Sequence, residues 1–433
     1  MNIKEKGMKL TKDIISEIKD GKFDEKLLDI YVDKEVLEYQ KNRYINALQK
    51  FEELYGESEV EIYSAPGRSE VGGNHTDHQR GQVLACGLNL DVIAIVAKTD
   101  DGIIKIVSDD YNIDDIDIKD LAKRDSEENT SESLIRGVAK RIEDEGYVIG
   151  GFKTFMTSDV LRGSGMSSSA AFEVAIGTIL SGLYNDMKIS PVFIAQASQY
   201  AENVYFGKPC GLMDQMASSV GSLVNIDFED PKNPIIKKVD VDFGKFGHSL
   251  CIVDTKGSHA DLTPEYAAIP PEMKSVAAYF GKEVLREVSE DEFYANLSDI
   301  REKVSDRAVV RAMHFFKDHR TVSYQVEALE KGDFEEFKKW ITSSGNSSFK
   351  YLQNVYATSD YNNQGLSVGL AVSERVLDGK GAVRVHGGGF AGTIQAFVPD
   401  ELVPEYRAAM DKLFGDGSCH VLKVRKYGGM KVC

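Results

Sequence analysis

A run of glycines and serines that leads straight into an apolar helical pattern is the feature that most constrains this chain. Residues 161–171 read Leu-Arg-Gly-Ser-Gly-Met-Ser-Ser-Ser-Ala-Ala, and apolar residues then recur at helical spacing from Phe172 to Leu183. Glycine lets the backbone adopt positive φ and approach a ligand, and the first N–H groups of a helix have no partner within it. The run therefore predicts a phosphate cradle at a helix N-terminus, made by Gly163, Ser164, Gly165, Ser167, Ser168 and Ser169.

The simplest alternative is an ordinary helix that is capped by serine. Three consecutive serines and two glycines provide more hydrogen-bond donors than a cap requires, which favours the cradle. The run is not a Walker loop, because the Gly-x-x-x-x-Gly-Lys-Ser/Thr pattern and its lysine are absent.

Charge and cysteine content narrow the class of protein. Lys and Arg number 52 against 69 Asp and Glu, and the net charge of −17 argues against nucleic acid or an anionic membrane as the main partner. The 5 cysteines are scattered and never form a Cys-x-x-Cys pair, which predicts reduced thiols and a cytoplasmic location. No segment approaches about 18 consecutive apolar residues, so we expect neither secretion nor a membrane span.

A polar, glycine-rich loop follows a predicted strand. The strand is expected to begin at Val60 and to end at Pro66, and residues 65–81 then concentrate arginine, asparagine, histidine and aspartate. Binding groups collect on loops that rigid strands hold, and short polar side chains suit a ligand with many hydroxyls. A solvated turn is the alternative, but Arg68 lies near several acceptors in this loop, which favours a binding site.

Two acids lie in a third stretch. A helix is expected to begin at Ser190-Pro191 and to reach Glu202, and residues 207–215 then read Gly-Lys-Pro-Cys-Gly-Leu-Met-Asp-Gln. Taken singly, Glu202 is most simply a surface residue of this helix. Asp214 is most simply a charge that favours the start of the next helix.

Together these stretches resemble the GHMP kinases, the superfamily of galactokinase and of homoserine, mevalonate and phosphomevalonate kinases, in its galactokinase form. Residues 67–78 are similar to the signature Gly-Arg-x-Asn-Leu-Ile-Gly-Glu-His-x-Asp-Tyr, and residues 201–215 to Ala-Glu-x-x-x-x-Gly-x-Pro-Cys-Gly-x-Met-Asp-Gln. The resemblance implies an α+β, two-domain GHMP kinase fold with the active site between the domains. The expected division is a helical N-terminal extension at 1–45, an N-terminal domain at 46–235 and a C-terminal domain at 236–433.

The resemblance also implies the roles of individual residues. Arg68 matches the arginine beside the transferred phosphoryl group, and Asp214 matches the acid that faces the anomeric hydroxyl of the sugar. The cofactors implied are ATP and Mg²⁺, with the metal held by the hydroxyl of Ser169 and by Glu202. The substrate-binding residues implied are Asn74, His75, Asp77 and Tyr266, although Tyr266 is nearly as well explained as a core residue.

The chain departs from the galactokinase pattern at several positions. Glu70 replaces the family Asn, Gly72 replaces Ile, Asn74 replaces the sugar-binding Glu and His78 replaces Tyr. An amide in place of a carboxylate donates as well as accepts and carries no charge. If Asn74 faces the C6 end of the sugar, the pocket therefore loses a repulsion toward anions.

The predicted activity is the ATP-dependent phosphorylation of galactose to galactose 1-phosphate. Asn74 motivates one alternative, an anomeric kinase for a modified galacto-sugar such as galacturonate. A second alternative is a sensor of sugar and ATP without catalytic activity, but such sensors lose residues from the serine-alanine run, which is intact here at Ser168 to Ala171. The expected partners are a small sugar and ATP, bound to a monomer.

Overall fold

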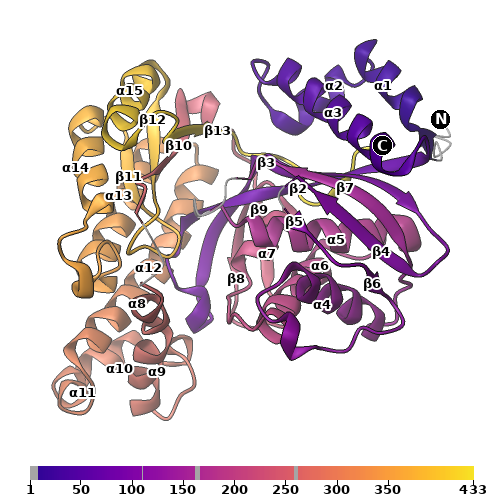
Figure 1. Ribbon diagram of the computed structural model, residues 1–433. Helices are drawn as coiled ribbons and strands as arrows, with labels where there is room; N and C mark the ends of the chain where they lie inside the picture. The colour runs from indigo at the N-terminus through magenta and orange to yellow at the C-terminus, as the bar shows by residue number, and fades with distance from the viewer. Residues whose placement is uncertain (1–7, 110, 161–165, 258–261) are drawn as a thin grey trace.

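The computed structural model describes residues 8–109, 111–160, 166–257 and 262–433, and within them the chain forms one ten-stranded and one four-stranded sheet, each covered by helices (Figure 1). In the larger sheet the strand order is β1-β2-β3-β7-β4-β5, and only the β4–β7 pair among the described strands is parallel. The mixed architecture confirms the α+β class predicted from the sequence. The strands of this sheet are β1 Lys9–Leu10, β2 Glu59–Gly72, β3 Gln82–Lys98, β4 Ile103–Ser108, β5 Tyr111–Asn112, β6 Ile116–Asp117, β7 Phe152–Ser158, β8 Leu223–Asp227, β9 Ile235–Val239 and β14 Met430–Lys431.

The larger sheet is buried on both faces, because successive side chains of a strand point to opposite sides. On one face Ala94 and Met156 join the core formed with the helices that follow the serine run. On the other face Ile93 and Ile95 join a separate core formed with the N-terminal helices. The helices of the first face are α4 Ser131–Asp144, α5 Ser168–Asn185, α6 Pro191–Tyr200 and α7 Met213–Val220, with the wider helical turn η3 Ala201–Phe206 between the last two.

The N-terminal segment packs on the larger sheet, and its third helix continues past residue 45, where the predicted extension ends. Its helices are α1 Thr11–Lys19, α2 Asp24–Tyr31 and α3 Leu37–Tyr55, and they lie over the face opposite α4–α7 (Figure 1). Apolar residues of all three helices are buried against the sheet, among them Ile14, Leu27 and Phe51. This segment therefore completes the core of the N-terminal domain.

The second sheet is antiparallel and has the strand order β11-β12-β10-β13. Its strands are β10 His248–Asp254, β11 Ala382–His386, β12 Thr393–Pro399 and β13 Cys419–Leu422. The helices of this half are α8 Thr263–Ala267, α9 Ile269–Tyr279, α10 Glu290–Ala295, α11 Leu297–Lys303, α12 Asp306–Glu330, α13 Phe334–Ser347, α14 Gly365–Leu377 and α15 Val403–Phe414.

The two halves of the chain are interleaved at their boundary. β9 begins at Ile235 and pairs with β8, so the predicted boundary between residues 235 and 236 cuts a strand of the larger sheet. The last strand, β14, also returns to that sheet and pairs with β2. A break between the sheets therefore follows β9, and the C-terminal tail belongs with the N-terminal domain.

One predicted strand is longer than expected. β2 does not end at Pro66 but continues to Gly72, with a shift in its pairing to β3 between Pro66 and Arg68. A bulge of this kind accommodates the missing N–H of proline, so the strand carries the first part of the polar loop.

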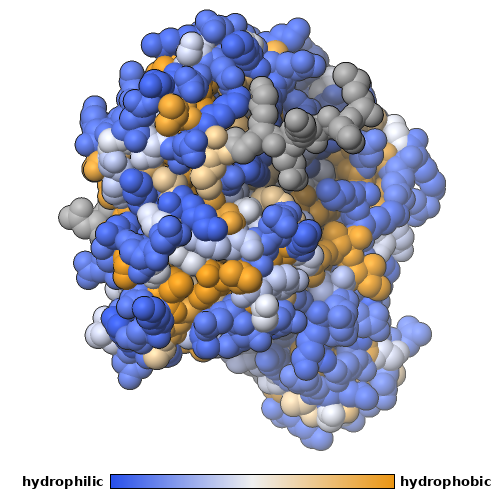
Figure 2. Space-filling model, turned by 90° about the vertical axis from the view of Figure 1, so that its right-hand side faces the viewer, coloured by the Kyte–Doolittle hydropathy of each residue, from blue (hydrophilic) through white to orange (hydrophobic). Residues whose placement is uncertain are grey.

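Polar and charged side chains cover most of the face shown in Figure 2, with smaller apolar patches between them. Among the residues that the structure describes, no helix combines the length and the apolar character needed to cross a membrane.

Candidate active site

A bidentate ion pair joins the polar loop to the third predicted stretch. Nε of Arg68, on β2, donates to Oδ1 of Asp214 over 2.7 Å, and Nη2 donates to Oδ2 over 2.8 Å. Asp214 lies in the first turn of α7, and its side chain is 31% exposed, whereas that of Arg68 is 7% exposed. The guanidinium is thus fixed by the protein while the carboxylate stays accessible.

The serine run adds a third group to this pair. The hydroxyl of Ser167 donates a hydrogen bond to Oδ2 of Asp214. Burial acts to raise the pKa of the Asp214 carboxyl, but the charge and hydrogen bonds of Arg68 and the bond from Ser167 outweigh it and hold that pKa below its usual range. Asp214 is therefore an ionised carboxylate at neutral pH.

The predicted helix after the serine run is present as α5, which begins at Ser168. Ser167 precedes it with φ of 54°, a left-handed conformation that is uncommon for a residue other than glycine. Its hydroxyl points to Asp214 and makes no bond to the helix amides. The expected cradle residues Gly163, Ser164 and Gly165 lie outside the described residues.

Ser168 and Ser169 face a partly apolar cavity of ≈ 470 Å³. The apolar lining comes from β3, β7, α4, α5 and η3. Its lining residues include Val92, Leu134, Met156, Val160, Phe172 and Phe206. A cavity of this size and character, at the start of a helix, suits a ligand with an apolar ring and an anionic group.

A smaller cavity of ≈ 90 Å³ lies at the Arg68–Asp214 pair. It is lined mostly by polar and charged residues, from β2, η3, α7, α8 and the loops beside them. The lining residues are Arg68, Glu70, His75, Asp77, His78, Glu202, Lys208, Cys210, Gly211, Met213, Asp214, Tyr266, Gly387 and Gly388. The structure therefore brings together six of the predicted residues from the polar loop, the third stretch and the C-terminal half, namely Arg68, His75, Asp77, Glu202, Asp214 and Tyr266.

The ring of His75 contacts two other rings of this lining, those of His78 and Tyr266. The ring centroids of His75 and Tyr266 lie 5.2 Å apart, and Nε2 of His75 donates to the carbonyl of Gly388 over 3.1 Å. Burial lowers the pKa of His75 to about 3, with the nearby His78 adding to the effect. His75 is therefore neutral and oriented by the glycine loop.

Glu202 lies in η3 and is 4% exposed. Nζ of Lys208 donates to its Oε1 over 3.0 Å, and Nε2 of Gln215 donates to its Oε2 over 2.7 Å. Nε2 of Gln215 also reaches Oε2 of the buried Glu173 at 3.2 Å. A carboxylate has about four lone-pair sites, so Glu202 keeps acceptor capacity for a further ligand.

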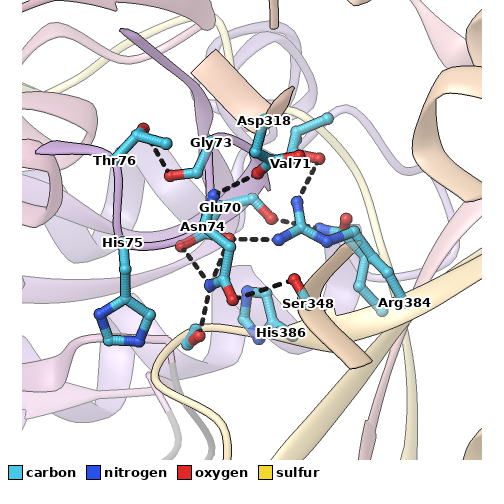
Figure 3. Close-up of polar contacts among 12 residues, drawn as sticks. Glu70, Val71, Gly73, Asn74, His75, Thr76, Asp318, Ser348, Arg384 and His386 are labelled. Atoms are coloured by element: carbon cyan, nitrogen blue, oxygen red, sulfur yellow. Dashed lines mark hydrogen bonds and ion pairs between the residues drawn. The ribbon is translucent and has the colours of Figure 1, made fainter. Parts of the chain in front are cut away.

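Asn74 is the one predicted sugar-binding residue that does not reach the lining of this cavity. Its side chain is fully buried, and both ends are occupied by the protein (Figure 3). Nδ2 donates to Glu70 and, over 2.7 Å, to the carbonyl of Gly387, while Oδ1 accepts from Ser348 and Asn354. This placement gives the Asn74 amide no free group to turn toward a ligand, contrary to the expectation that it faces a sugar.

Two lining residues with charged side chains were not predicted as site residues. Lys208 lies within the third stretch. Its neighbours Gly207 and Pro209 indicate a loop of defined conformation between the two acids, which could have marked Lys208 as a site residue. Glu70 lies two residues after Arg68 on β2, so strand alternation could have placed it beside Arg68. Gly387 and Gly388, in the loop between β11 and β12, close the cavity from the C-terminal half.

Comparison with known proteins gives two family matches. Residues 49–98 match the galactokinase galactose-binding signature, and residues 133–222 match the GHMP kinases N-terminal domain. The galactokinase of Actinobacillus pleuropneumoniae serotype 3 (strain JL03) is 32% identical over 364 residues, which cover 83% of this chain and 91% of that protein. The galactokinase of Glaesserella parasuis serovar 5 (strain SH0165) is 32% identical over 361 residues, 83% of this chain and 90% of that protein.

Solved structures show the same fold. Lactococcus lactis galactokinase complexed with galactose matches with a TM-score of 0.76 at 22% identity, covering 88% of this chain and 98% of that one. The mevalonate kinase of Methanococcus jannaschii matches with a TM-score of 0.60 at 16% identity, covering 85% and 99%. These matches confirm the GHMP kinase fold expected from the sequence motifs.

Proposed function

The chain belongs to the galactokinase family of the GHMP kinases, and from that premise we propose that it transfers the γ-phosphoryl group of ATP to the anomeric hydroxyl of galactose. The products are galactose 1-phosphate, ADP and a proton. The observation that carries the proposal is the accessible carboxylate of Asp214, held by Arg68 through two hydrogen bonds in a polar cavity.

Asp214 is the group that accepts or orients the proton of the attacking hydroxyl. Its lowered pKa keeps it ionised, so it can accept a hydrogen bond throughout the neutral range. Arg68 stabilises this carboxylate and the negative charge that develops on the transferred group. Phosphoryl transfer depends chiefly on such positioning and neutralisation of charge, for which fixed side chains suffice.

The start of α5 is the proposed site of the nucleotide phosphates. The N–H groups of its first turn lack partners within the helix, and the positive end of the helix dipole favours anions. Ser167, Ser168 and Ser169 belong to this phosphate site with Gly163, Ser164 and Gly165, and the partly apolar cavity beside Ser168 and Ser169 is the proposed place of the base. The one tryptophan of the chain, Trp340, lies in α13, so the base would rest on the aliphatic and phenylalanine side chains of that cavity.

Mg²⁺ is the proposed metal, held by Glu202 and by the hydroxyl of Ser169. Both offer oxygen donors, which this hard cation prefers, and the Lys208 and Gln215 bonds fix the direction of the Glu202 carboxylate. The bound ion would neutralise charge on the nucleotide phosphates.

His75, Asp77 and Tyr266 are the proposed contacts for the sugar hydroxyls, since all three line the cavity at Asp214. Asn74 is proposed to support them from behind the cavity wall. The argument for galacturonate therefore weakens, because it required the neutral amide of Asn74 to face the ligand, and its amide is instead bound by Glu70 and Gly387.

An ADP-release assay with galactose, galacturonate, glucose and mevalonate tests the proposal. We expect turnover with galactose and its loss by roughly a hundred-fold or more in Asp214→Asn, in line with the contribution of a positioned general base. Turnover of galacturonate but not of galactose would mean that the substrate is the uronate. Binding of ATP and galactose without turnover of any compound would identify a sensor.

A further inference from the structure

A second carboxylate, Glu70, lines the same cavity and has no role so far. It follows Arg68 by two residues on β2, and the pairing of the two residues with β3 is continuous, opposite Ala85 and Gly87. Both side chains therefore point to the same face of the strand, roughly 6.6 Å apart along it. Ser69, between them, points to the other face, where its hydroxyl contacts Nε2 of His386 at 3.0 Å.

Glu70 is held rigidly at this position. It is 2% exposed, and Nη2 of Arg384 donates to its Oε1 over 2.6 Å. Nδ2 of Asn74 donates to the same oxygen over 3.0 Å and lies 3.3 Å from Oε2 (Figure 3). Because Asn74 also bonds Gly387, the amide fixes the Glu70 carboxylate against the glycine loop that closes the cavity.

The second oxygen of Glu70 has the greater freedom to accept. Oε1 takes the bond from Arg384 and the shorter bond from Asn74, whereas Oε2 takes only the longer bond from Asn74 among the residues that the structure describes. A carboxylate oxygen can accept two hydrogen bonds. Oε2 thus retains capacity for a hydroxyl that enters the cavity.

The two departures from the family signature compensate each other. At positions 70 and 74 the signature has Asn and Glu, and this chain has Glu70 and Asn74 in contact with each other. The carboxylate and the amide are thus both retained, but it is Glu70 that lines the cavity.

We propose that Glu70 is a specificity-determining residue, whose carboxylate accepts a hydrogen bond from a sugar hydroxyl remote from the anomeric carbon, and that Asn74 is the positioning residue behind it. The hydroxyl is remote because Glu70 lies one strand repeat from Arg68, which is bound to Asp214 at the reacting end. This inference rests on the proposed function as a sugar kinase.

The chemical class of the substrate follows from the charge of the lining. The lining holds four carboxylate side chains but only two basic ones, Arg68 and Lys208. Burial raises the pKa of Glu70 to about 7 although Arg384 and Arg68 act against it, so above that pH a sugar carboxylate beside Glu70 would meet a like charge in a small, poorly solvated space. The site therefore selects a neutral sugar over a uronate.

A thermodynamic cycle that combines a substitution at Glu70 with removal of single sugar hydroxyls tests this proposal. We would measure kcat/KM for galactose and for its 2-, 3-, 4- and 6-deoxy analogues in wild type and in Glu70→Gln. In wild type the analogue that lacks the contacted hydroxyl loses roughly ten- to a hundred-fold, as expected for a charged hydrogen bond. In Glu70→Gln we expect that loss to shrink about ten-fold, because an amide oxygen makes only a neutral bond.

Two further measurements sharpen the result. In Glu70→Gln the kcat/KM for galacturonate should rise relative to that for galactose. The double variant Glu70→Asn/Asn74→Glu should recover kcat/KM for galactose relative to Glu70→Asn alone. Glu61→Gln is the matched control, because Glu61 is a buried, paired carboxylate on the same strand that does not line the cavity. It should leave every ratio between sugars unchanged.

Equilibrium binding of the same sugars, followed by calorimetry, separates the two claims. Losses that are equal in wild type and Glu70→Gln for every deoxy sugar would overturn the role of Glu70, even with galactose turned over normally. Absence of turnover in wild type, with the binding cycle still showing coupling to Glu70, would overturn the kinase function and keep this specificity residue.

Discussion

Arg68 controls the ionisation of Asp214 as well as its position. Two hydrogen bonds join the pair, and the pKa of Asp214 lies below its usual range although burial acts against this. A lysine at position 68 would keep the positive charge but could not reproduce the planar, bidentate contact. We therefore expect Arg68 to set both the rate and the acid limit of the proposed reaction.

We expect Arg68→Lys to lower kcat by roughly a hundred- to a thousand-fold, as removal of one stabilising donor does elsewhere. The sign of the pH effect follows from the lowered pKa. In wild type the ionised form of Asp214 is lost only as pH falls below the usual aspartate range, whereas in the variant the loss begins at higher pH. A pH profile of kcat checks this, with Arg80→Lys as control because Arg80 pairs with Glu283 and Glu287 outside the cavity. An unshifted acid limb would contradict it.

Glu202 is the residue through which metal dependence should be visible. Addition of EDTA should abolish turnover in wild type, and Glu202→Gln should raise the Mg²⁺ concentration at half-maximal rate by roughly ten-fold or more, because a neutral amide binds this cation more weakly. Glu61→Gln removes a comparable carboxylate paired with a lysine, Lys431, and should leave the Mg²⁺ dependence unchanged. If the Mg²⁺ concentration at half-maximal rate were the same in both variants, Glu202 would not be a metal ligand.

Of the two residues that differ from the family signature in a reciprocal way, Glu70 and Asn74, only the position of Glu70 could be predicted from the sequence. Alternation from Arg68 places positions 70, 72 and 74 on one face of an unbroken strand. The pairing of β2 with β3 shifts between Glu70 and Gly72, and Gly73 then takes φ of 83°, so alternation no longer holds at Asn74. Glu70, before the shift, was predictable as a lining residue, while the burial of Asn74 depends on Ser348 and Asn354, far along the chain.

At the scale of the element, the loop before α7 is shaped by its contact with the polar loop. A Cβ added to Gly211 would lie 1.8 Å from Oδ2 of Asp77, so only glycine permits the observed approach. The conflict is with the end of a side chain and not with backbone, so Gly211→Ala would displace the Asp77 carboxylate and leave the fold intact.

We therefore expect Gly211→Ala to raise KM for galactose by roughly ten-fold, the effect of losing about one hydrogen bond, with little change in thermal stability. Gly365→Ala is the control, because a Cβ at Gly365, in the first turn of α14, would make only ordinary contacts of 3.4 Å or more. Steady-state kinetics and melting curves of both variants decide the matter. A fall in melting temperature without a change in KM would mean that the loop yields instead of Asp77.

Elements with a strong local pattern were predictable, and irregular ones were not. The apolar spacing after the serine run gave α5, and the Ser190-Pro191 pair gave the start of α6, whose cap is the hydroxyl of Ser190 on the N–H of Phe193. The expected helix through Glu202 instead changes to the wider turn η3 at Ala201. This change places Glu202 between Lys208 and Gln215, and it depends on packing that no local pattern reports.

At the scale of the whole molecule, contacts between distant segments decide where the domains divide. β14 pairs with β2 although 366 residues separate Met430 from its partner Ser64. The expected boundary between residues 235 and 236 carried no information on this return. The N-terminal helices and the C-terminal tail are parts of one core, which composition alone does not reveal.

Asp91 on β3 is the point where these distant segments meet. Nη1 of Arg43, from α3, donates to its Oδ1 over 2.7 Å, and Nη1 of Arg425, from the tail, donates to its Oδ2 over 2.8 Å. The hydroxyls of Tyr31 and Ser64 also bond this carboxylate, which is fully buried. Burial acts to raise the pKa of Asp91, but the two arginines outweigh it and lower that pKa.

We expect Asp91→Asn to lower the free energy of unfolding by about 3–5 kcal/mol, because it removes the one carboxylate that pairs with buried Arg425 among the described residues and leaves Arg43 with Asp159 alone. Since a lowered pKa gives stability that is present above the unfolded pKa and lost as pH falls, the difference from wild type should shrink in acid. Urea unfolding at several pH values measures this, with the exposed Asp306→Asn as control. KM for galactose should stay unchanged, because Asp91 does not line the cavity. A variant as stable as wild type would mean that α1–α3 and the tail are held by apolar packing alone.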